Sequence, residues 1–478
     1  MRLLLQQIRL HALAQPARPA IMLADRVITF GMVQSGIDSV RQVLFDLRLE
    51  PDTCIGVLVD NPARHFIIAL ALISNGHAFA PLRVDLVSAA KAAGMTTLIS
   101  DAPLSTDTAV RAISADENWF MRQNAPQRPL PHFQPNRIVQ VAFTSGSTGR
   151  PKPIAYTERA LSARVARNFL VGIGKTERIM SAYGISGPGF QQALQMLTCG
   201  RTICFAPPPD ILRVTSYYNV EELRGSVAQI RGLLNDNETA GRPVHLKQIS
   251  AGGAYLPYQL AQEIRESFRA DLICPYSAVE AGGIGCASGE LLKLRAQRGN
   301  CYSVLTDIEI VDDDDNVLPD GTDGRIRVRS PQTARPFDGS LVEPEHAWKE
   351  WVTLGDIGRI EPDGLLVLTG RNDEVINFGG AKVDPEVIEN LLRTHPAVED
   401  AAVLRMIGSD GLHEAWAVLK SRGVVPLEAI NAWLSARLTG ELGAFHLTRV
   451  EIVSEIPKTP TAKVARGALR KMVANGGC

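Results

Sequence analysis

Short apolar runs that alternate with helical segments constrain the fold of this chain more than any other feature. Residues 54–59 form a continuous apolar run that ends at Asp60-Asn61-Pro62, and a helical pattern follows from Ala63 to Gly76. Two further apolar stretches end at Pro81 and Ser100. Strands that are apolar on both faces and alternate with helices are typical of a parallel sheet covered by helices. The sequence therefore predicts α/β layers in the N-terminal part of the chain.

The same pattern continues beyond residue 139 and then changes character near residue 304. Segments that alternate apolar and polar residues predict half-buried antiparallel strands. The elements predicted here are helices at 158–170 and 187–199, strands at 201–206 and 246–250, and alternating strands at 304–311 and 324–329. We therefore expect α/β layers followed by a β-rich subdomain, all within one large N-terminal body.

A domain boundary is predicted near residues 370–375. Beyond it, Asp384-Pro385 is a typical helix start, because Asp accepts from the first free amides and Pro fits the first turn. The predicted helix has Val387, Ile388, Leu391 and Leu392 on one face, and it is followed by strands at 400–406, 414–420 and 449–454 and a helix at 427–438. We expect a large domain over residues 1–371 and a small α+β domain over residues 372–478.

Composition excludes several classes of protein. In 478 residues, 50 Lys and Arg balance 51 Asp and Glu, which disfavours a nucleic-acid binder. The longest apolar run, residues 66–74, is too short to insert into a membrane. The seven cysteines form no C-x-x-C pair, and the first 15 residues are too polar for a signal peptide. We therefore expect a cytoplasmic protein with reduced thiols and no structural zinc.

The segment 141–152 predicts a phosphate-binding loop. An apolar strand leads into hydroxyl residues and glycines and ends in Lys152. Glycines let backbone N–H groups turn toward an anion, hydroxyls add donors, and lysine adds charge. The spacing is not that of a Walker A loop, and Pro151 and Pro153 oppose a helix at this point. The predicted loop residues are Thr144, Ser145, Gly146, Ser147, Thr148, Gly149 and Lys152.

Residues 144–152 resemble the phosphate-loop signature of the acyl-adenylate-forming (AMP-binding) superfamily. Its members include acyl-CoA synthetases, the adenylation domains of peptide synthetases, and luciferases. Six further segments resemble the family's motifs in the family's order, and together they cover nearly the whole chain. They are Ile28-Thr-Phe30, Ser250-Ala-Gly-Gly-Ala254, Pro275-Tyr-Ser-Ala-Val-Glu280, Leu354-Gly-Asp356, Gly370-Arg-Asn-Asp373 and Pro457-Lys-Thr-Pro-Thr-Ala-Lys463.

The resemblance implies a role for each matching residue. Catalytic roles go to Lys463, Glu280 and Thr144, and the last two would also hold Mg²⁺ beside the phosphates. Tyr276 would lie flat on the adenine, and Asp356 and Arg371 would bind the ribose. The remaining nucleotide contacts would come from Gly252, Gly253, Ala254 and Ser277, and those to the acid from Tyr183, Gly184 and Gly252.

The resemblance also implies a two-step reaction. A carboxylate attacks the α-phosphate of ATP and gives acyl-AMP and pyrophosphate, and a thiol then displaces AMP. The small domain would act as a mobile lid that swings about Asp373, bringing first Lys463 and then Gly379-Gly380 to the site. The thiol would belong to CoA or to the phosphopantetheine of a carrier protein that acts in trans.

The match departs from the family pattern at a few positions. Val279 replaces the usual Thr, Cys274 lies where Asn or Asp is common, and Ala462 replaces the Gly before Lys463. None of these changes removes a charged group, so we expect an active ligase, with a nucleotide-binding pseudo-enzyme as the alternative. A buried ammonium needs a partner, and no Asp lies between 178 and 209, which disfavours an α-amino acid. Fatty and aryl acids both stay open, as do the acceptor thiol and the oligomeric state.

One acidic segment resembles a calcium loop only superficially. Residues 312–315 are all Asp, but Val317 stands where such a loop needs Gly, and Asp323 where it needs Glu. The segment is therefore predicted to be a hairpin turn between strands.

Overall fold

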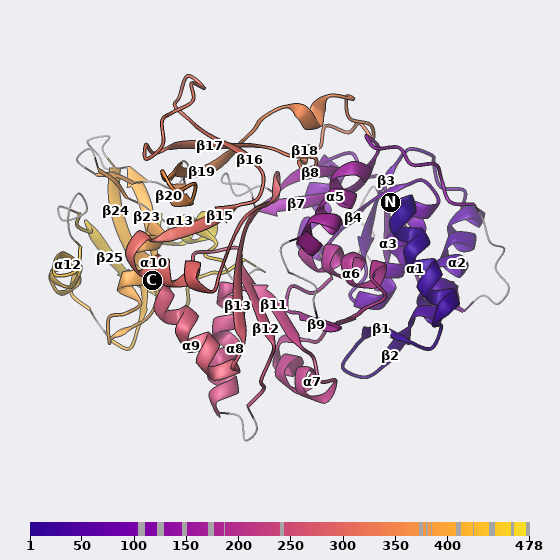
Figure 1. Ribbon diagram of the computed structural model, residues 1–478, viewed down its shortest axis with the longest axis horizontal. Coiled ribbons are helices and arrows are strands. Elements are labelled where there is room, and N and C mark those ends of the chain that lie inside the picture. The colour runs from indigo at the N-terminus through magenta and orange to yellow at the C-terminus, as the bar shows by residue number, and fades with distance from the viewer. Residues whose placement is uncertain are drawn as a thin grey trace.

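Two large sheets form the N-terminal body of the protein, seen here in a computed structural model (Figure 1). The structure describes the chain except residues 104–109, 122–128, 146–150, 171–175, 186, 240–242, 372–375, 379–380, 384, 408–412, 424, 439–444, 460–462 and 475–478.

The first sheet confirms the predicted parallel layer. Within the described ranges its strand order is β18-β8-β7-β4-β3-β5-β6, parallel from β7 to β6 and antiparallel over β18, β8 and β7. The strands are β3 (Cys54–Leu58), β4 (Ala78–Pro81), β5 (Thr97–Ser100), β6 (Arg111–Ser114), β7 (Ile138–Ser145), β8 (Pro151–Thr157) and β18 (Arg335–Pro336).

The second sheet joins the α/β layers to the β-rich subdomain. In the described part of the chain its order is β16-β17-β19-β20-β15-β14-β13-β12-β11-β9-β10-β1-β2. Strands β13 to β1 are parallel, and their neighbours on both sides are antiparallel. The strands are β1 (Pro19–Met22), β2 (Val27–Thr29), β9 (Arg178–Ser181), β10 (Thr202–Cys204), β11 (Glu222–Ser226), β12 (Gln248–Gly252), β13 (Asp271–Ala278), β14 (Gly282–Ser288), β15 (Asn300–Val304), β16 (Asp307–Val311), β17 (Gly324–Arg329), β19 (Val352–Ile360) and β20 (Leu366–Arg371).

The strand predicted over 304–311 is confirmed over Asp307–Val311, which is β16 and pairs with β17, but its predicted start is wrong. Val304 is the last residue of β15, which pairs with β14 and β20, and residues 305 and 306 divide the two strands. At the division Leu305 donates its amide to the Ile284 carbonyl at 2.8 Å, and the Thr306 hydroxyl donates to the Arg329 carbonyl at 3.2 Å. The chain changes strand partner there, and the alternating pattern does not encode that change. The acidic segment 312–315 lies in the turn between β16 and β17, as predicted.

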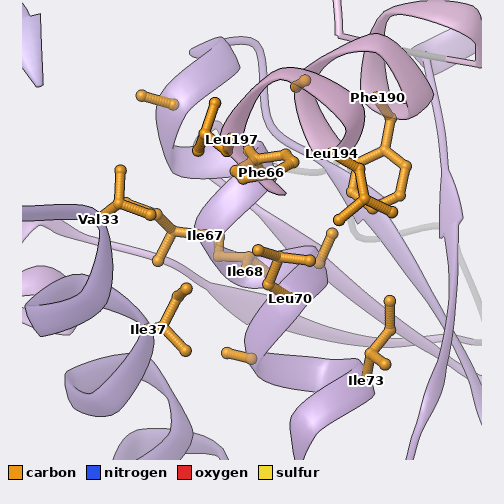
Figure 2. Packing of buried hydrophobic residues seen from close by; sticks show 14 of the residues in the cluster. Val33, Ile37, Phe66, Ile67, Ile68, Leu70, Ile73, Phe190, Leu194 and Leu197 are labelled. Carbon is orange, nitrogen blue, oxygen red and sulfur yellow. The ribbon is translucent and has the colours of Figure 1, made fainter. Parts of the chain in front are cut away.

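Helix α3 (Pro62–Ser74) lies at the centre of the largest hydrophobic core. Asn61 caps it, since its side chain accepts from the amides of Ala63 and Arg64 at 3.1 Å each. Figure 2 shows its side chains between those of two other helices, α2 (Phe30–Asp46) and α6 (Pro188–Thr198). The ring of Phe190 lies 5.5 Å from that of Phe66, so the three helices share one core. The other helices of the body are α1 (Arg2–Ala14), α4 (Val87–Ala92), α5 (Glu158–Leu170), α7 (Ile211–Tyr217), α8 (Val227–Thr239), α9 (Tyr258–Phe268), α10 (Glu290–Arg298) and the short turns η1 (Val84–Leu86), η2 (Glu117–Phe120), η3 (Pro208–Asp210) and η4 (Ala347–Lys349).

The C-terminal elements form separate hydrophobic clusters at the end of the molecule away from α1 (Figure 1). They are β21 (Ile376–Phe378), β22 (Ala381–Val383), α11 (Pro385–Leu392), β23 (Val398–Ile407), β24 (His413–Ser421), α12 (Leu427–Ser435), β25 (Arg449–Ile452) and α13 (Arg466–Ala474). Helix α11 begins at Pro385, as predicted, while Asp384 lies outside the described residues.

The buried face of α11 differs from the prediction at one position. Ile388 and Leu392 are buried as expected, but the Val387 side chain is 43% exposed. Glu389 is buried in its place at 2% exposure. An apolar stripe alone cannot show this, because Glu389 is kept inside by charged partners from other elements. No helix in the described part of the chain is long and apolar enough to cross a membrane.

Candidate active site

The ends of the predicted phosphate loop lie on two paired strands. Strand β7 runs antiparallel to β8, with Thr144 opposite Lys152 and Ser145 opposite Pro151. The chain therefore enters a strand at Pro151, and the prediction that no helix opens there is confirmed. The predicted loop residues Gly146, Ser147, Thr148 and Gly149 lie outside the described residues.

Two residues that the sequence assigned to the adenine and the ribose are in direct contact. Tyr276 lies in β13 and is buried, and its hydroxyl donates to Oδ2 of Asp356 in β19 at 2.6 Å. The Tyr302 ring packs on the Tyr276 ring at 5.3 Å between centroids. Asp356 is also the register partner of Arg371 in β20. A carboxylate and an aromatic ring are thus held together at one place on the second sheet.

The backbone around Glu280 is held by residues that the sequence analysis missed. Arg164 in α5 donates from Nη2 to the Val279 carbonyl at 2.7 Å and from Nε to the Gln332 carbonyl at 2.9 Å. The Ala334 amide donates to the Glu280 carbonyl at 2.6 Å. Burial lowers the pKa of the Arg164 guanidinium, and nearby Tyr156 and Glu280 oppose that shift. Arg164 and Glu280 therefore lie close enough for their charges to interact. The sequence shows Arg164 only as a charged residue within the predicted helix 158–170.

The half-buried Glu280 carboxylate has the chemistry that Mg²⁺ prefers. The described residues contain no group of three or more His, Cys, Asp or Glu that could hold a metal ion by themselves. Mg²⁺ commonly takes one or two carboxylates and completes its shell with phosphate oxygens and water. Glu280 thus fits a magnesium ion that is bound together with a polyphosphate.

Lys463 from the C-terminal unit reaches the end of β12. Its Cε lies 3.8 Å from the place that a Cβ on Gly253 would occupy. Gly253 has a φ of +81°, a conformation that favours glycine. The backbone of Lys463 is held in a turn, because its amide donates to the Thr459 hydroxyl at 3.1 Å and its carbonyl accepts from the Thr459 amide at 2.7 Å. The structure therefore brings together Lys463 and the predicted segment 250–254.

The wall predicted to contact the acid follows strand β9. Burial raises the pKa of the Tyr183 hydroxyl, and the nearby Cys274 thiol adds to the rise. Gly184 has a φ of +68°, and its carbonyl oxygen lies 1.5 Å from the place of a Cβ on Gly189. Only glycine fits at 189. Tyr183 and Gly184 thus lie on a wall that passes near Cys274 of β13, beside Tyr276.

A buried ion pair supports this wall and was also missed by the sequence analysis. Arg224 contacts Glu222 at 2.6 Å and donates to Gln195 at 3.0 Å, and its carbonyl accepts from the Ala182 amide at 2.8 Å. Arg224 is already paired with a carboxylate. It therefore stabilises the wall, and we do not assign it to binding the carboxylate of a substrate.

The structure describes two of the four remaining predicted site residues, Ser277 and Ala254, together with their side chains. Ser277 is exposed next to Tyr276, and Ala254 follows Gly253 at half-burial. The side chain of Arg371 and the whole of Asp373 lie outside the described residues.

Comparison with known proteins gives two family matches. The family described as AMP-binding enzyme matches residues 8–337, and the AMP-binding enzyme C-terminal domain matches residues 387–463.

Among curated relatives, acyl-coenzyme A synthetase ACSM2B of Homo sapiens is 28% identical over 69% of this chain, and the chain spans about 60% of that protein's length. Enterobactin synthase component E of Escherichia coli is 27% identical over 95% of this chain and 92% of its own. Among solved structures, o-succinylbenzoate coenzyme A synthetase of Bacillus subtilis in complex with ATP and magnesium superposes with a TM-score of 0.83. It has 20% identity and covers 97% of this chain and 99% of that one, so it shows the same fold.

Proposed function

This chain belongs to the AMP-binding enzyme family, and from that premise we propose that it is an ATP-dependent carboxylic acid ligase. The first step joins a carboxylate oxygen to the α-phosphorus of ATP and releases pyrophosphate. The second step joins a thiol sulfur to the acyl carbon and releases AMP. The observation that carries the proposal is the approach of the Lys463 side chain to Gly253, which follows β12, because β12 pairs with the strand β13 that carries Tyr276, the partner of Asp356.

The residues present suit distinct parts of the first step. Tyr276 offers a ring to the adenine, and Asp356 and Arg371 offer a carboxylate and a guanidinium to the ribose. Thr144, the loop to Gly149, and Lys152 would bind phosphates, with Glu280 and Thr144 holding Mg²⁺. The ion, when bound, neutralises charge on the pyrophosphate. Lys463 would stabilise negative charge that develops as the carboxylate attacks.

We place the boundary between the two domains after residue 371, with Asp373 as the hinge of a mobile lid. Separate hydrophobic clusters in the C-terminal elements support the division. In this proposal, the position of Lys463 beside Gly253 belongs to the arrangement of the two domains that forms acyl-AMP. The second arrangement would present Gly379-Gly380 for transfer to the thiol.

A fatty or aryl acid fits the acyl wall better than an α-amino acid does. The buried carboxylate of Glu222 is already paired with Arg224, and 178–209 contains no Asp for an ammonium. The names of the human and Bacillus relatives support CoA as the acceptor, and a carrier protein that acts in trans is the alternative. We propose a cytoplasmic location, which suits a chain whose positive and negative side chains balance.

A hydroxamate-trapping screen tests the proposal. The protein is incubated with ATP, Mg²⁺, hydroxylamine and a panel of fatty, aryl and amino acids. We expect a hydroxamate and pyrophosphate from at least one fatty or aryl acid. Lys463→Ala should slow both products by about 100-fold or more, because it removes a charge that acts in the transition state, while ATP still binds. Lys471→Ala changes an exposed lysine of α13 and is the control.

Pyrophosphate release at the wild-type rate by the Lys463→Ala protein would contradict the role of the lysine. Absence of product from the wild-type protein with every acid of the panel would contradict the proposed ligase function. Repeating the best acid with CoA and with a phosphopantetheine-loaded carrier protein identifies the acceptor.

A further inference from the structure

Glu386 connects the C-terminal unit to the segment that follows β12. It lies in the first turn of α11, and its Oε1 accepts the backbone amide of Tyr255 at 3.2 Å. Tyr255 is two residues beyond Gly253, which lies beside Lys463. One carboxylate therefore meets the body at almost the same place as the lysine.

Charged groups surround this carboxylate. Burial raises the pKa of the Glu386 carboxyl, and the positive charge of Lys463 is the largest effect that opposes the rise, followed by the Tyr255 amide, Arg466 and Arg393. Burial also raises the pKa of the neighbouring Glu389 carboxyl, and the charge of Glu386 adds to that rise, so the two carboxylates are close enough to interact. Glu386 therefore lies within reach of Lys463 and of the body at once.

The second carboxylate of α11 has a different function. Glu389 contacts Arg466 at 2.5 Å and Arg393 at 3.5 Å, and it accepts the Val403 amide at 2.9 Å. All these partners belong to the C-terminal unit itself. Glu389 thus stabilises that unit, whereas Glu386 faces outward to the body.

We infer that Glu386 is a positioning residue for Lys463. It fixes α11 on the Tyr255 amide and presents its charge to the lysine, so that Lys463 is held beside Gly253. The inference rests on the proposed function, in which the two units rotate against each other between steps. Because the Glu386–Tyr255 contact crosses between these units, it stabilises the adenylation arrangement and contributes nothing to the thioester step.

The test measures the two half-reactions separately in Glu386→Gln. We expect acyl-AMP formation, measured as the release of pyrophosphate, to slow about tenfold, because the variant loses a hydrogen bond to a charged group. Thioester formation from synthetic acyl-AMP and CoA should stay within about twofold of wild type. Glu428→Gln is the matched control, because Glu428 is an exposed glutamate in the first turn of α12. Equal slowing of both half-reactions, or of neither, would overturn the inference.

A measurement that needs no activity separates this inference from the proposed function. Hydrogen exchange of the peptide that contains Tyr255 should be faster in Glu386→Gln than in wild type, while Glu428→Gln leaves it unchanged. Identical exchange in all three proteins would contradict the Glu386–Tyr255 contact. If exchange is faster in Glu386→Gln but the wild-type protein activates no acid, the contact is supported and the proposed ligase function is contradicted.

Discussion

Replacing Tyr276 by phenylalanine removes one oxygen atom from the candidate site and leaves the ring in place. The hydroxyl donates to Asp356 at 2.6 Å, and the ring packs on Tyr302. Phenylalanine keeps the packing and any stacking on an adenine. The substitution therefore reports on how well Asp356 is held for the ribose.

The size of the effect follows from the charge and exposure of the acceptor. A hydrogen bond to a charged group contributes roughly 1.5–3 kcal/mol. Asp356 is half-buried, so water can replace part of the lost bond and the lower end applies. About 1.5 kcal/mol corresponds to roughly a tenfold loss of nucleotide affinity. We expect the KM for ATP to rise about tenfold, and kcat to change less than about threefold because the hydroxyl is not assigned to the reacting atoms.

Pyrophosphate release at varied ATP and saturating acid measures both constants. Tyr218→Phe is the control, because its hydroxyl donates to the Leu23 carbonyl at 3.1 Å outside the site. This control should lose a little stability and keep its KM for ATP. If Tyr276→Phe leaves the KM unchanged while Asp356→Ala raises it, the hydroxyl does not orient the carboxylate and the reasoning is refuted.

Two further predictions concern Arg164 and His65. Arg164→Met removes the guanidinium donor from the carbonyls of Val279 and Gln332, and Val279 keeps only the longer bond from the Tyr156 hydroxyl at 3.4 Å. We expect about 2 kcal/mol lower stability and a higher Mg²⁺ requirement in a magnesium titration; an unchanged requirement would contradict the link to Glu280. His65 is buried with Nδ1 3.1 Å from the Val59 carbonyl oxygen, and burial lowers its pKa to about 4. In the unfolded chain the imidazole binds a proton near pH 6.5, so about 2 kcal/mol of the free energy of unfolding should be lost between pH 7 and pH 5. Urea unfolding of His65→Leu should show a smaller loss of stability over this range, and an equal loss in both proteins would contradict this.

The order of helices and strands was predictable because local patterns determine it. Predicted helix 158–170 is α5, and the apolar run from residue 54 is β3, since each follows from a pattern of residues within one segment. The separation of Val304, at the end of β15, from β16 was not predictable in this way. It depends on which distant strand each of the two strands pairs with.

The residues of the candidate site also differ in whether a local pattern could identify them. The sequence selected Tyr276, Asp356, Glu280 and Lys463 by resemblance, and the structure brings the first two into contact and the last beside Gly253. Their roles stay predictions. The supporting residues Arg164 and Glu386 were not found, because their partners lie 115 and 131 positions away along the chain.

The paired strands β7 and β8 have a consequence for the energetics of nucleotide binding. Because Thr144 and Lys152 face each other across two antiparallel strands, their Cα atoms are roughly 5 Å apart before any ligand arrives. The conformational entropy lost in bringing the two ends of such a loop together is therefore a cost of folding, not of binding. Substitutions that weaken the pairing of β7 with β8 would transfer that cost to ATP, and would weaken its affinity without touching a single phosphate contact.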